Sequence, residues 1–196
     1  MSLDTRIFYA INNFARNTPW MHSAVLGYAT YGTVLFAGLM VAGWWYARND
    51  ADPARMAAAI WVPLAVLIAL GINQPIADSV GETRPCNALH DIVVLHCNTD
   101  AGFPSDHAVM AGAATAGLWL VHRRFGALAA LASVLMGFGR VYVGAHYPKD
   151  VLAGFVLGAA VSLIGYPVVR TALMRLISSV ARTPLRGVVT AENAPQ

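Results

Sequence analysis

The sequence has little charge and very little cysteine. Only 12% of its 196 residues are charged and 57% are hydrophobic, whereas an ordinary soluble domain averages about 25% charged and about 45–50% apolar residues. A single soluble domain of this length has too little interior to hide such an apolar excess. The composition therefore excludes an ordinary soluble protein and predicts one whose surface faces lipid.

Long stretches without any charged residue predict membrane spans. A helix needs about 20 mostly apolar residues to cross a bilayer core of about 30 Å. The longest uncharged stretch runs from Arg16 to Arg48, and four others follow along the chain. We therefore predict an all-α integral membrane bundle of about five transmembrane helices, at residues 22–47, 56–78, 105–122, 125–143 and 149–172.

The first twenty residues are interrupted by charges and lack the continuous apolar core of a signal peptide. Ile7, Phe8, Ile11 and Phe14 recur at helical spacing. This pattern favours an amphipathic helix over residues 1–20 that lies in the membrane interface. A short solvated lead-in is the alternative.

The C-terminal residues differ in composition from the apolar segments before them. Residues 179–196 contain two prolines, a glycine and several polar side chains, which predicts a mobile cytoplasmic tail. No repeat, linker or low-complexity block divides the rest of the chain. We expect residues 1–178 to form a single membrane domain.

The distribution of basic residues predicts the orientation in the plasma membrane. With five spans, eight of the thirteen basic residues fall on one side, and basic residues near span ends are retained in the cytoplasm. The C-terminus is then cytoplasmic and the N-terminus outside. Because the charge is dispersed around the spans, nucleic-acid binding is not expected. The residues of the cytoplasmic side are Arg48, Arg55, Arg123, Arg124, Arg170, Arg175, Arg182 and Arg186.

The two cysteines fall in the same predicted outer loop, between the second and third spans. An extracytoplasmic compartment is oxidising and permits a disulfide between Cys86 and Cys97. Two free thiols remain an alternative, because the geometry that a disulfide requires is not readable from sequence.

Polar and ionisable residues collect at the outer ends of the predicted spans, where such groups usually mark function. Five helices would bring these ends together around one pocket. The pocket would then hold the residues Arg84, Ser105, Asp106, His107, Arg140, His146, Lys149 and Asp150.

Several of these residues are suited to binding phosphate. The planar guanidiniums of Arg84 and Arg140 match phosphate oxygens. Ser105 stands at the predicted start of the third span, where its hydroxyl and free backbone N–H groups would add donors. The alternatives are a capping role for Ser105 and Asp106, and headgroup anchoring by the two arginines.

Two histidines add reactivity. A neutral imidazole attacks phosphorus, and a charged one delivers a proton to a leaving oxygen. His146 and Asp150 are spaced i, i+4, so we expect the carboxylate to hold one ring N–H and leave the other nitrogen free. His107 would protonate the leaving group. In the alternative interpretation, His146 is an interfacial loop residue, and Asp150 is a charge at a helix start that the helix dipole stabilises.

These residues resemble the type-2 phosphatidic acid phosphatase superfamily, or lipid phosphate phosphatases. The family signature is a Lys followed after six residues by Arg-Pro, then Pro-Ser-Gly-His, then Ser-Arg with five residues before His and three more before Asp. Here Arg84-Pro85 ends the first part, residues 104–107 read Pro-Ser-Asp-His, and Arg140, His146 and Asp150 keep the spacing of the third.

The sequence departs from the signature at three positions. Ala77 stands where the family has its lysine, which removes one phosphate donor, and Gly139 replaces serine. Asp106 replaces glycine, as in the small bacterial undecaprenyl/polyprenyl diphosphatase branch. Lys149, the only lysine of the chain, is an auxiliary candidate for the lost donor, as are Asn73 and Gln74.

The resemblance implies residue roles and a reaction. By resemblance His146 is the nucleophile oriented by Asp150, His107 is the general acid, and phosphate binds to Arg84, Ser105 and Arg140, with Asp106 as a possible auxiliary. It implies no cofactor and no metal. The substrate would be a lipid phosphate drawn from the bilayer, with undecaprenyl or another polyprenyl diphosphate hydrolysed to the monophosphate. Phosphatidate, phosphatidylglycerol phosphate and a polyprenyl phosphoribosyl phosphate are alternatives.

Two other classes compete with this interpretation. A zinc hydrolase would use His107, His146 and Asp150, together with His90 or His96. A lipid-binding or transport protein would also place polar groups among helices. The sequence leaves the oligomeric state open.

Overall fold

The structure is a computed structural model that describes residues 2–50 and 52–191. Within these ranges the chain is helical and contains no strand, which confirms the predicted all-α fold. The helices are α1 (Leu3–Asn17), the 3-10 helix η1 (Pro19–Met21), α2 (His22–Tyr31), α3 (Thr33–Asp50), α4 (Pro53–Val80), α5 (Pro85–Ala88), α6 (Asp106–Val121), α7 (Arg123–Tyr142), α8 (Pro148–Val180) and α9 (Arg186–Val189).

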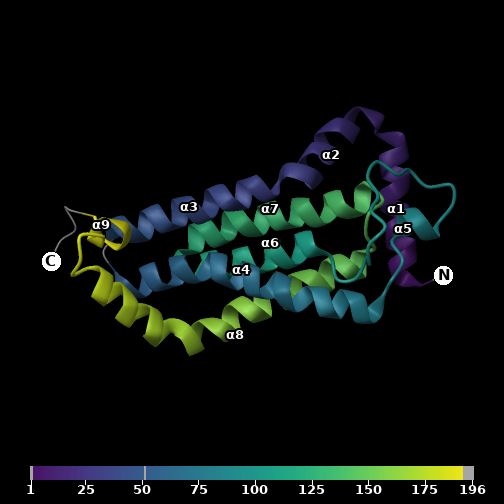
Figure 1. Cartoon of the computed structure of the whole chain (residues 1–196). Coiled ribbons are helices and arrows are strands. Elements are labelled where there is room, and N and C mark those ends of the chain that lie inside the picture. The colour runs from purple at the N-terminus through teal and green to yellow at the C-terminus, as the bar shows by residue number, and fades with distance from the viewer. Residues whose placement is uncertain (1, 51, 192–196) are drawn as a thin grey trace.

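The long helices α3, α4, α6, α7 and α8 run alongside one another (Figure 1). Most residues of α6 are buried, and this helix packs against α4, α7 and α8, so it is the centre of the bundle. Four of the predicted spans correspond to α4, α6, α7 and α8, although α8 continues well beyond residue 172.

The predicted span over residues 22–47 is wrong as a single helix. It consists of two helices bent by 51°, which break at Gly32 between α2 and α3. A Cβ at Gly32 would lie 2.7 Å from Met136 Cε of α7. The absence of a side chain therefore lets the bend pack closely on the neighbouring helix.

Three described segments are long and apolar enough to cross a membrane: Pro53–Ala88, Arg123–Tyr142 and Pro148–Val180. The bent pair makes a fourth if it counts as one span. The 16 residues of α6 are fewer than a spanning helix usually has. Because α6 is enclosed by its neighbours, its length does not have to match the bilayer.

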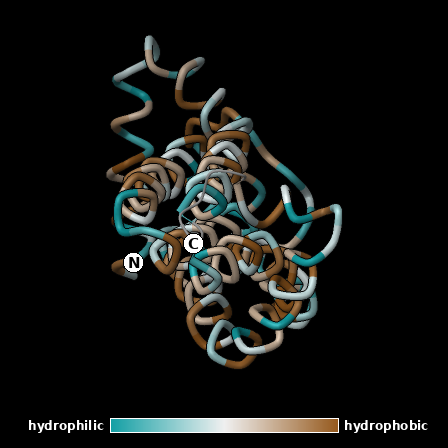
Figure 2. Tube along the Cα trace, turned by 90° about the vertical axis from the view of Figure 1, so that its left-hand side faces the viewer, coloured by the Kyte–Doolittle hydropathy of each residue, from teal (hydrophilic) through white to brown (hydrophobic). Residues whose placement is uncertain are grey.

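The outer surface of the bundle is apolar. Leu67, Val134 and Ile164 are more than half exposed on α4, α7 and α8. Figure 2 shows hydrophobic residues on helices all round the bundle. Such a surface is stable only in contact with lipid. The protein is therefore a membrane protein.

The predicted N-terminal helix is present and lies across one end of the long helices (Figure 1). Its apolar stripe is divided. Phe8 is buried beside Val141 and Val151, whereas Ile7 and Phe14 are exposed. One face of the helix therefore packs against the end of the bundle, and the other face is exposed.

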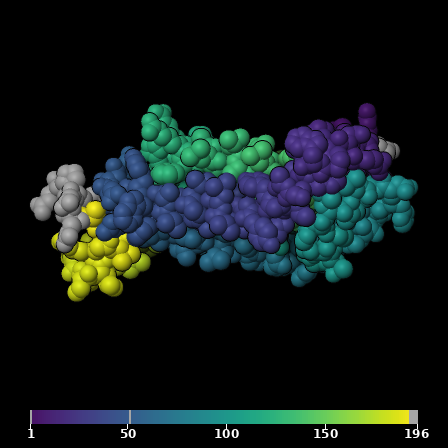
Figure 3. Space-filling view, turned by 90° about the horizontal axis from the view of Figure 1, so that it is seen from above, coloured from purple at the N-terminus to yellow at the C-terminus, as the bar shows by residue number. Residues whose placement is uncertain are grey.

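The structure describes the segment predicted as a C-terminal tail as far as Ala191. Helix α8 continues to Val180, and the following residues turn back onto α3. Trp44 Nε1 donates to the Val188 carbonyl over 3.1 Å, and Ala191 N donates to the Arg48 carbonyl over 3.0 Å. Residues 192–196 lie outside the described part of the chain. In Figure 3 the end of the bundle that holds α9 is opposite the end formed by α1, α2 and the loop before α6.

Glycines let α6 and α8 approach closely. A Cβ at Gly158 would lie 2.0 Å from the Val109 carbonyl oxygen, and one at Gly154 would lie 2.8 Å from the Ser105 carbonyl oxygen. The backbone N–H of Ser105 donates to the carbonyl of Asp150 over 3.1 Å. Small residues thus bring the first turn of α8 against the start of α6.

Candidate active site

The structure brings the predicted site residues together at the α1 end of the bundle. Arg84 lies between α4 and α5, Ser105 precedes α6, and Arg140 is in the last turn of α7. His146 lies in the turn before α8, and Asp150 is in the first turn of that helix. All five side chains are buried. Residues far apart in the sequence therefore form one enclosed polar cluster.

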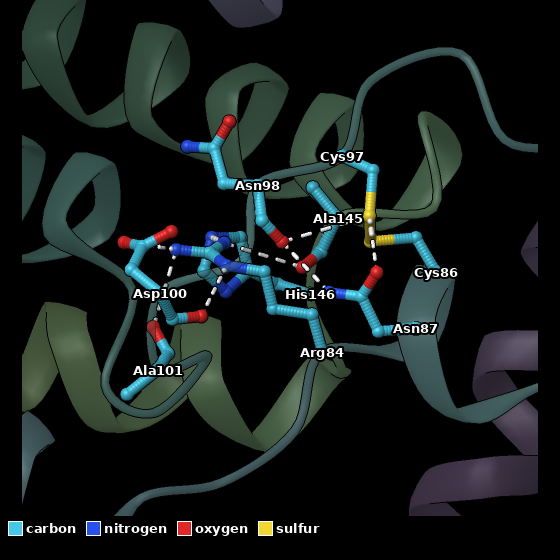
Figure 4. The surroundings of a disulfide bond; sticks show 9 residues. All are labelled: Arg84, Cys86, Asn87, Cys97, Asn98, Asp100, Ala101, Ala145 and His146. Atoms are coloured by element: carbon cyan, nitrogen blue, oxygen red, sulfur yellow. Dashed lines mark hydrogen bonds and ion pairs between the residues drawn. A yellow bond between two sulfur atoms is a disulfide. The ribbon is translucent and has the colours of Figure 1, made fainter.

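The two ring nitrogens of His146 have different partners. Nδ1 lies 2.8 Å from the carbonyl oxygen of Gly102, and because a carbonyl only accepts, Nδ1 carries the hydrogen. Nε2 then has a free lone pair, which accepts from Arg84 Nη1 over 2.6 Å (Figure 4). The nitrogen that faces the arginine is thus the unprotonated one.

The predicted direct hydrogen bond between Asp150 and His146 is wrong. Asp150 Oδ2 lies 3.6 Å from Nδ1, beyond hydrogen-bond distance, and accepts instead from the backbone N–H of Tyr147 over 2.8 Å. The carboxylate completes a capping box at the start of α8. The Asp150 oxygen that was predicted to accept from the His146 ring is therefore used to cap α8. The Gly102 carbonyl accepts from Nδ1 of His146 instead.

The surroundings of His146 keep its imidazole neutral. Burial, followed by the positive charges of Arg140 and Arg84, holds the pKa of His146 well below its ordinary value. The hydrogen bond to Gly102 acts in the opposite direction and is the weaker influence. A neutral ring is the form that attacks an electrophile.

Arg84 is held mainly by a loop segment that sequence reasoning missed. Its Nη2 donates to Asp100 Oδ2 over 2.9 Å and to the Ala101 carbonyl over 3.2 Å, and its Nε donates to the Asp100 carbonyl over 3.1 Å. Nη1 also lies 3.4 Å from the Ala145 carbonyl oxygen. Asp100 follows an irregular loop, so no helical spacing could have linked it to Arg84.

Three buried polar atoms of the cluster have no hydrogen-bond partner among the described residues: Ser105 Oγ, Arg140 Nε and Asp150 Oδ1. The Ser105 hydroxyl does not cap α6, although Ser105 occupies the cap position. Arg140 uses Nη1 on the Ala29 carbonyl at 3.3 Å. Because leaving a buried donor unpaired is costly, the Ser105 hydroxyl and the Arg140 Nε–H are suited to a bound ligand with acceptor oxygens, whereas Asp150 Oδ1 is itself an acceptor.

His107 lies in the first turn of α6 and is partly buried. It is close enough to Arg140, Arg84 and His146 to interact with them electrostatically. Its side chain makes no hydrogen bond within the described part of the chain. The ring is therefore free to meet a ligand beside the two arginines.

The two auxiliary candidates have protein partners. Asp106 Oδ1 accepts from Asn73 Nδ2 over 2.7 Å and from Gln74 Nε2 over 3.0 Å, so these α4 amides hold a carboxylate. Lys149 Nζ forms an ion pair with Glu82 Oε1 at 2.7 Å. Lys149 is therefore paired with a carboxylate and does not replace the phosphate donor that is missing at Ala77.

Cys86 and Cys97 form a disulfide in the structure, with Cα atoms 5.8 Å apart (Figure 4). The bond closes the loop next to Arg84. Among the described residues, no group of three or more His, Cys, Asp or Glu side chains is arranged to hold a metal ion, and His90 and His96 join no such group.

The fold and the site define a membrane helix bundle with a buried cluster of a histidine and two arginines, a combination suited to an anionic group such as phosphate. The chain belongs to the PAP2 superfamily, because the model of that family matches residues 58–174, more than half of the chain. It is similar to the undecaprenyl-diphosphatase BcrC of Bacillus subtilis (strain 168), with 27% identity over 162 residues that cover 83% of this chain and 82% of the relative.

Two solved structures share the fold. The crystal structure of LpxE from Aquifex aeolicus matches with a TM-score of 0.68 and 24% identity, over 85% of this chain and 96% of that one. The transmembrane PAP2 type phosphatidylglycerolphosphate phosphatase of Bacillus subtilis matches with a TM-score of 0.63 and 22% identity, over 93% of this chain and 90% of that one. The chain is thus a membrane lipid phosphatase of the PAP2 type.

Proposed function

We propose that the protein hydrolyses a polyprenyl diphosphate, with undecaprenyl diphosphate as the leading candidate, to the monophosphate and inorganic phosphate. The similarity to an undecaprenyl-diphosphatase over most of both chains supports this substrate class. The apolar surface of the bundle supports a substrate whose tail stays in the bilayer while its headgroup enters the polar cluster.

The reaction has two steps on His146. In the first, the Nε2 lone pair attacks the terminal phosphorus, an Nε2–P bond forms, and the P–O bond to the polyprenyl monophosphate breaks. In the second, water attacks phosphorus and gives a proton to His107, the Nε2–P bond breaks, inorganic phosphate leaves, and both histidines return to their starting states. The Nδ1–H bond to Gly102 supports this assignment, because it leaves Nε2 unprotonated.

The neighbouring side chains have the remaining roles. Arg84, Arg140 and Ser105 bind the transferred phosphate, and their charges and donors stabilise its transition state. His107 delivers the proton to the leaving oxygen. Asp150 acts indirectly: its side chain caps α8 by accepting from the Tyr147 backbone N–H, and the same oxygen lies 3.6 Å from Nδ1 of His146. None of these steps requires a metal ion, so a chelator should not remove activity.

The observation that carries the proposal is the pair of unpartnered donors beside a neutral histidine. Ser105 Oγ and Arg140 Nε are buried, have no partner in the described residues and belong to the cluster that contains His146 Nε2. A phosphate has acceptor oxygens for both donors and an electrophilic centre for the nitrogen. Phosphate also carries the negative charge that two buried guanidiniums favour.

We further propose that the site lies on the outer face of the plasma membrane and that the C-terminus is cytoplasmic. The larger number of basic residues on the predicted cytoplasmic side supports this orientation. An impermeant thiol reagent should label Cys86 or Cys97 in intact cells after mild reduction. A cysteine introduced at Arg123, at the opposite end, should be shielded, and the reverse pattern would invert the topology.

A substrate panel tests the function. Purified protein should release inorganic phosphate from undecaprenyl diphosphate faster than from phosphatidate, phosphatidylglycerol phosphate or a polyprenyl phosphoribosyl phosphate, at matched detergent mole fraction. Equal or faster turnover of phosphatidylglycerol phosphate would move the assignment to a phospholipid phosphatase. No phosphate release from any of the four would contradict the proposed reaction.

A further inference from the structure

We propose that Asp100 is a positioning residue, which aims Arg84 at the nucleophilic nitrogen of His146 from a loop closed by the Cys86–Cys97 disulfide. The inference rests on the proposed function of His146 and Arg84. It adds a residue outside the three motif segments that the sequence singled out.

The contacts of Arg84 divide between two edges of its guanidinium. Nε and Nη2 donate to the loop, at 3.1 Å to the Asp100 carbonyl, 2.9 Å to Asp100 Oδ2 and 3.2 Å to the Ala101 carbonyl. Nη1 alone reaches His146 Nε2, at 2.6 Å. Figure 4 shows Asp100 and His146 close to the same guanidinium. The loop therefore fixes one edge so that the other faces the reacting nitrogen.

The same short segment also orients His146. Gly102, two residues after Asp100, supplies the carbonyl that accepts from Nδ1 over 2.8 Å. Three successive residues thus hold both the arginine and the histidine in one mutual geometry. When phosphate binds, Nη1 can transfer its hydrogen bond from Nε2 to a phosphate oxygen while the opposite edge stays held by the loop.

Charge and exposure suit Asp100 to this role. The side chain of Arg84 is 5% exposed, whereas that of Asp100 is 59% exposed. The carboxylate therefore remains hydrated and balances a buried guanidinium without entering the space between Arg84 and His146. A second buried guanidinium, Arg140, lies near enough for the two positive charges to repel. A fixed counter-charge keeps Arg84 in place against that repulsion.

The loop is tied to Arg84 from both sides. Cys86 is two residues after Arg84 and Cys97 three residues before Asp100, so the disulfide joins the two arms close to the ion pair. Asn87 Nδ2 donates to the Asn98 carbonyl over 2.8 Å, and Gly102 N donates to the Glu82 carbonyl over 2.7 Å. The position of Arg84 is thus fixed by a disulfide and hydrogen bonds between the segments on either side of the loop.

The test compares Asp100→Ala and Asp100→Asn with Asp78→Asn. Asp78 is an exposed residue near the end of α4 with no partner in the described residues, so its variant controls for loss of one negative charge at this end. With polyprenyl diphosphate, Asp100→Ala should lower kcat/KM by about 10- to 100-fold, because a small misplacement of a positioned group has effects of this size. Asp100→Asn should recover part of the loss, and Asp78→Asn should match wild type.

A double-mutant cycle separates positioning from general stability. In the Arg84→Lys background, Asp100→Ala should cost less than about threefold, because the fork that Asp100 holds is already absent. Thermal unfolding of Asp100→Ala should match wild type. Full additivity, or an unchanged kcat/KM in Asp100→Ala, would overturn the inference. So would an unfolding shift that accounts for the whole loss.

Binding of inorganic phosphate to purified protein, measured by calorimetry, needs no turnover. Asp100→Ala should weaken it and Asp78→Asn should not. If wild type hydrolyses no lipid phosphate, the proposed function fails while this measurement still tests the inference. Equal phosphate affinity in wild type and Asp100→Ala would overturn the inference while leaving the proposed function intact.

Discussion

The two ends of the bundle use arginine in opposite ways. Near α9, Arg55 is more than a third exposed and pairs with Asp50, and Arg48 donates to the Gly187 carbonyl at the surface. At the α1 end, Arg84 and Arg140 are almost completely buried. One end has the hydrated arginines that orient a membrane protein, and the other has desolvated arginines that are costly without an anionic partner.

The difference shows that burial separates a ligand site from a membrane anchor. Both ends contain arginines, so residue type alone does not tell a ligand site from a membrane anchor. Asp100 balances Arg84, but Arg140 Nε has no partner in the described residues. Incomplete pairing of a buried cation is what makes the α1 end suited to a phosphate. The following predictions test this contrast, from the largest expected effect to the smallest.

Removal of the proposed nucleophile should give the largest difference between the two ends. His146→Ala should lower kcat by about 10⁴-fold or more, because no other group can form the covalent intermediate. Rapid-quench labelling should find acid-labile, base-stable phosphate on wild type and none on the variant, with chelator present. Arg123→Ala, at the opposite end, should keep wild-type labelling. Label on His146→Ala, or chelator inactivation that zinc reverses, would favour a metal-bound water instead.

Removal of the proposed general acid should have the next largest effect. His107→Ala should lower kcat by about 10²–10⁴-fold with a poor leaving group. A substrate whose leaving group has a low pKa should recover most of this loss, because it departs without a proton. Steady-state rates on the two substrate types measure the recovery. Equal losses on both would assign His107 to binding.

Truncation of the buried arginines should cost more than truncation of the exposed ones. Arg84→Ala and Arg140→Ala should each lower kcat/KM by about 10²–10³-fold, since their charge stabilises the transition state. Lysine should restore little, because it lacks the planar fork. Arg55→Ala and Arg48→Ala should stay near wild type. If the loss were equal at both ends, burial would not be the deciding difference.

The pH profile should report the environment of His146. Because burial and two positive charges hold its pKa well below the ordinary value, the neutral nucleophile persists in mildly acidic solution. The acid limb of kcat/KM should therefore fall below the ordinary pKa of a histidine. Arg140→Ala removes one of the charges and should move this limb to higher pH. An acid limb that stays in place in the variant would contradict the electrostatic cause.

Reduction of the disulfide should have the smallest effect. It should lower kcat/KM by about 2- to 10-fold, the equivalent of one hydrogen bond at about 0.5–1.5 kcal/mol, because Asn87 and Gly102 still tie the loop. The chain has only two cysteines, so any effect of reductant arises at the α1 end. Non-reducing mass spectrometry should detect the Cys86–Cys97 bridge. Free thiols in unreduced protein would rule it out.

Much of the fold was predictable because hydropathy acts locally along the chain. The uncharged stretches predicted α4, α6, α7 and α8. The predicted boundaries lie within a few residues of the observed ones, except at the C-terminal end of α8. The bend at Gly32 was missed, since it depends on how closely that residue packs on Met136 of another helix. The docking of the tail on α3 was missed for the same reason: its partners lie far away in sequence.

The sequence by itself determined the membrane class, the motif residues and the end of the bundle where they gather, because residue type and spacing carry that information. Only the tertiary structure decided the hydrogen-bond partners. Asp150 and Gly102 both lie near Nδ1 of His146, and the capping of α8 directs the carboxylate to Tyr147. Asp100 reaches Arg84 through an irregular loop. Such choices are competitions between groups from distant segments, and they are settled only when the chain is packed.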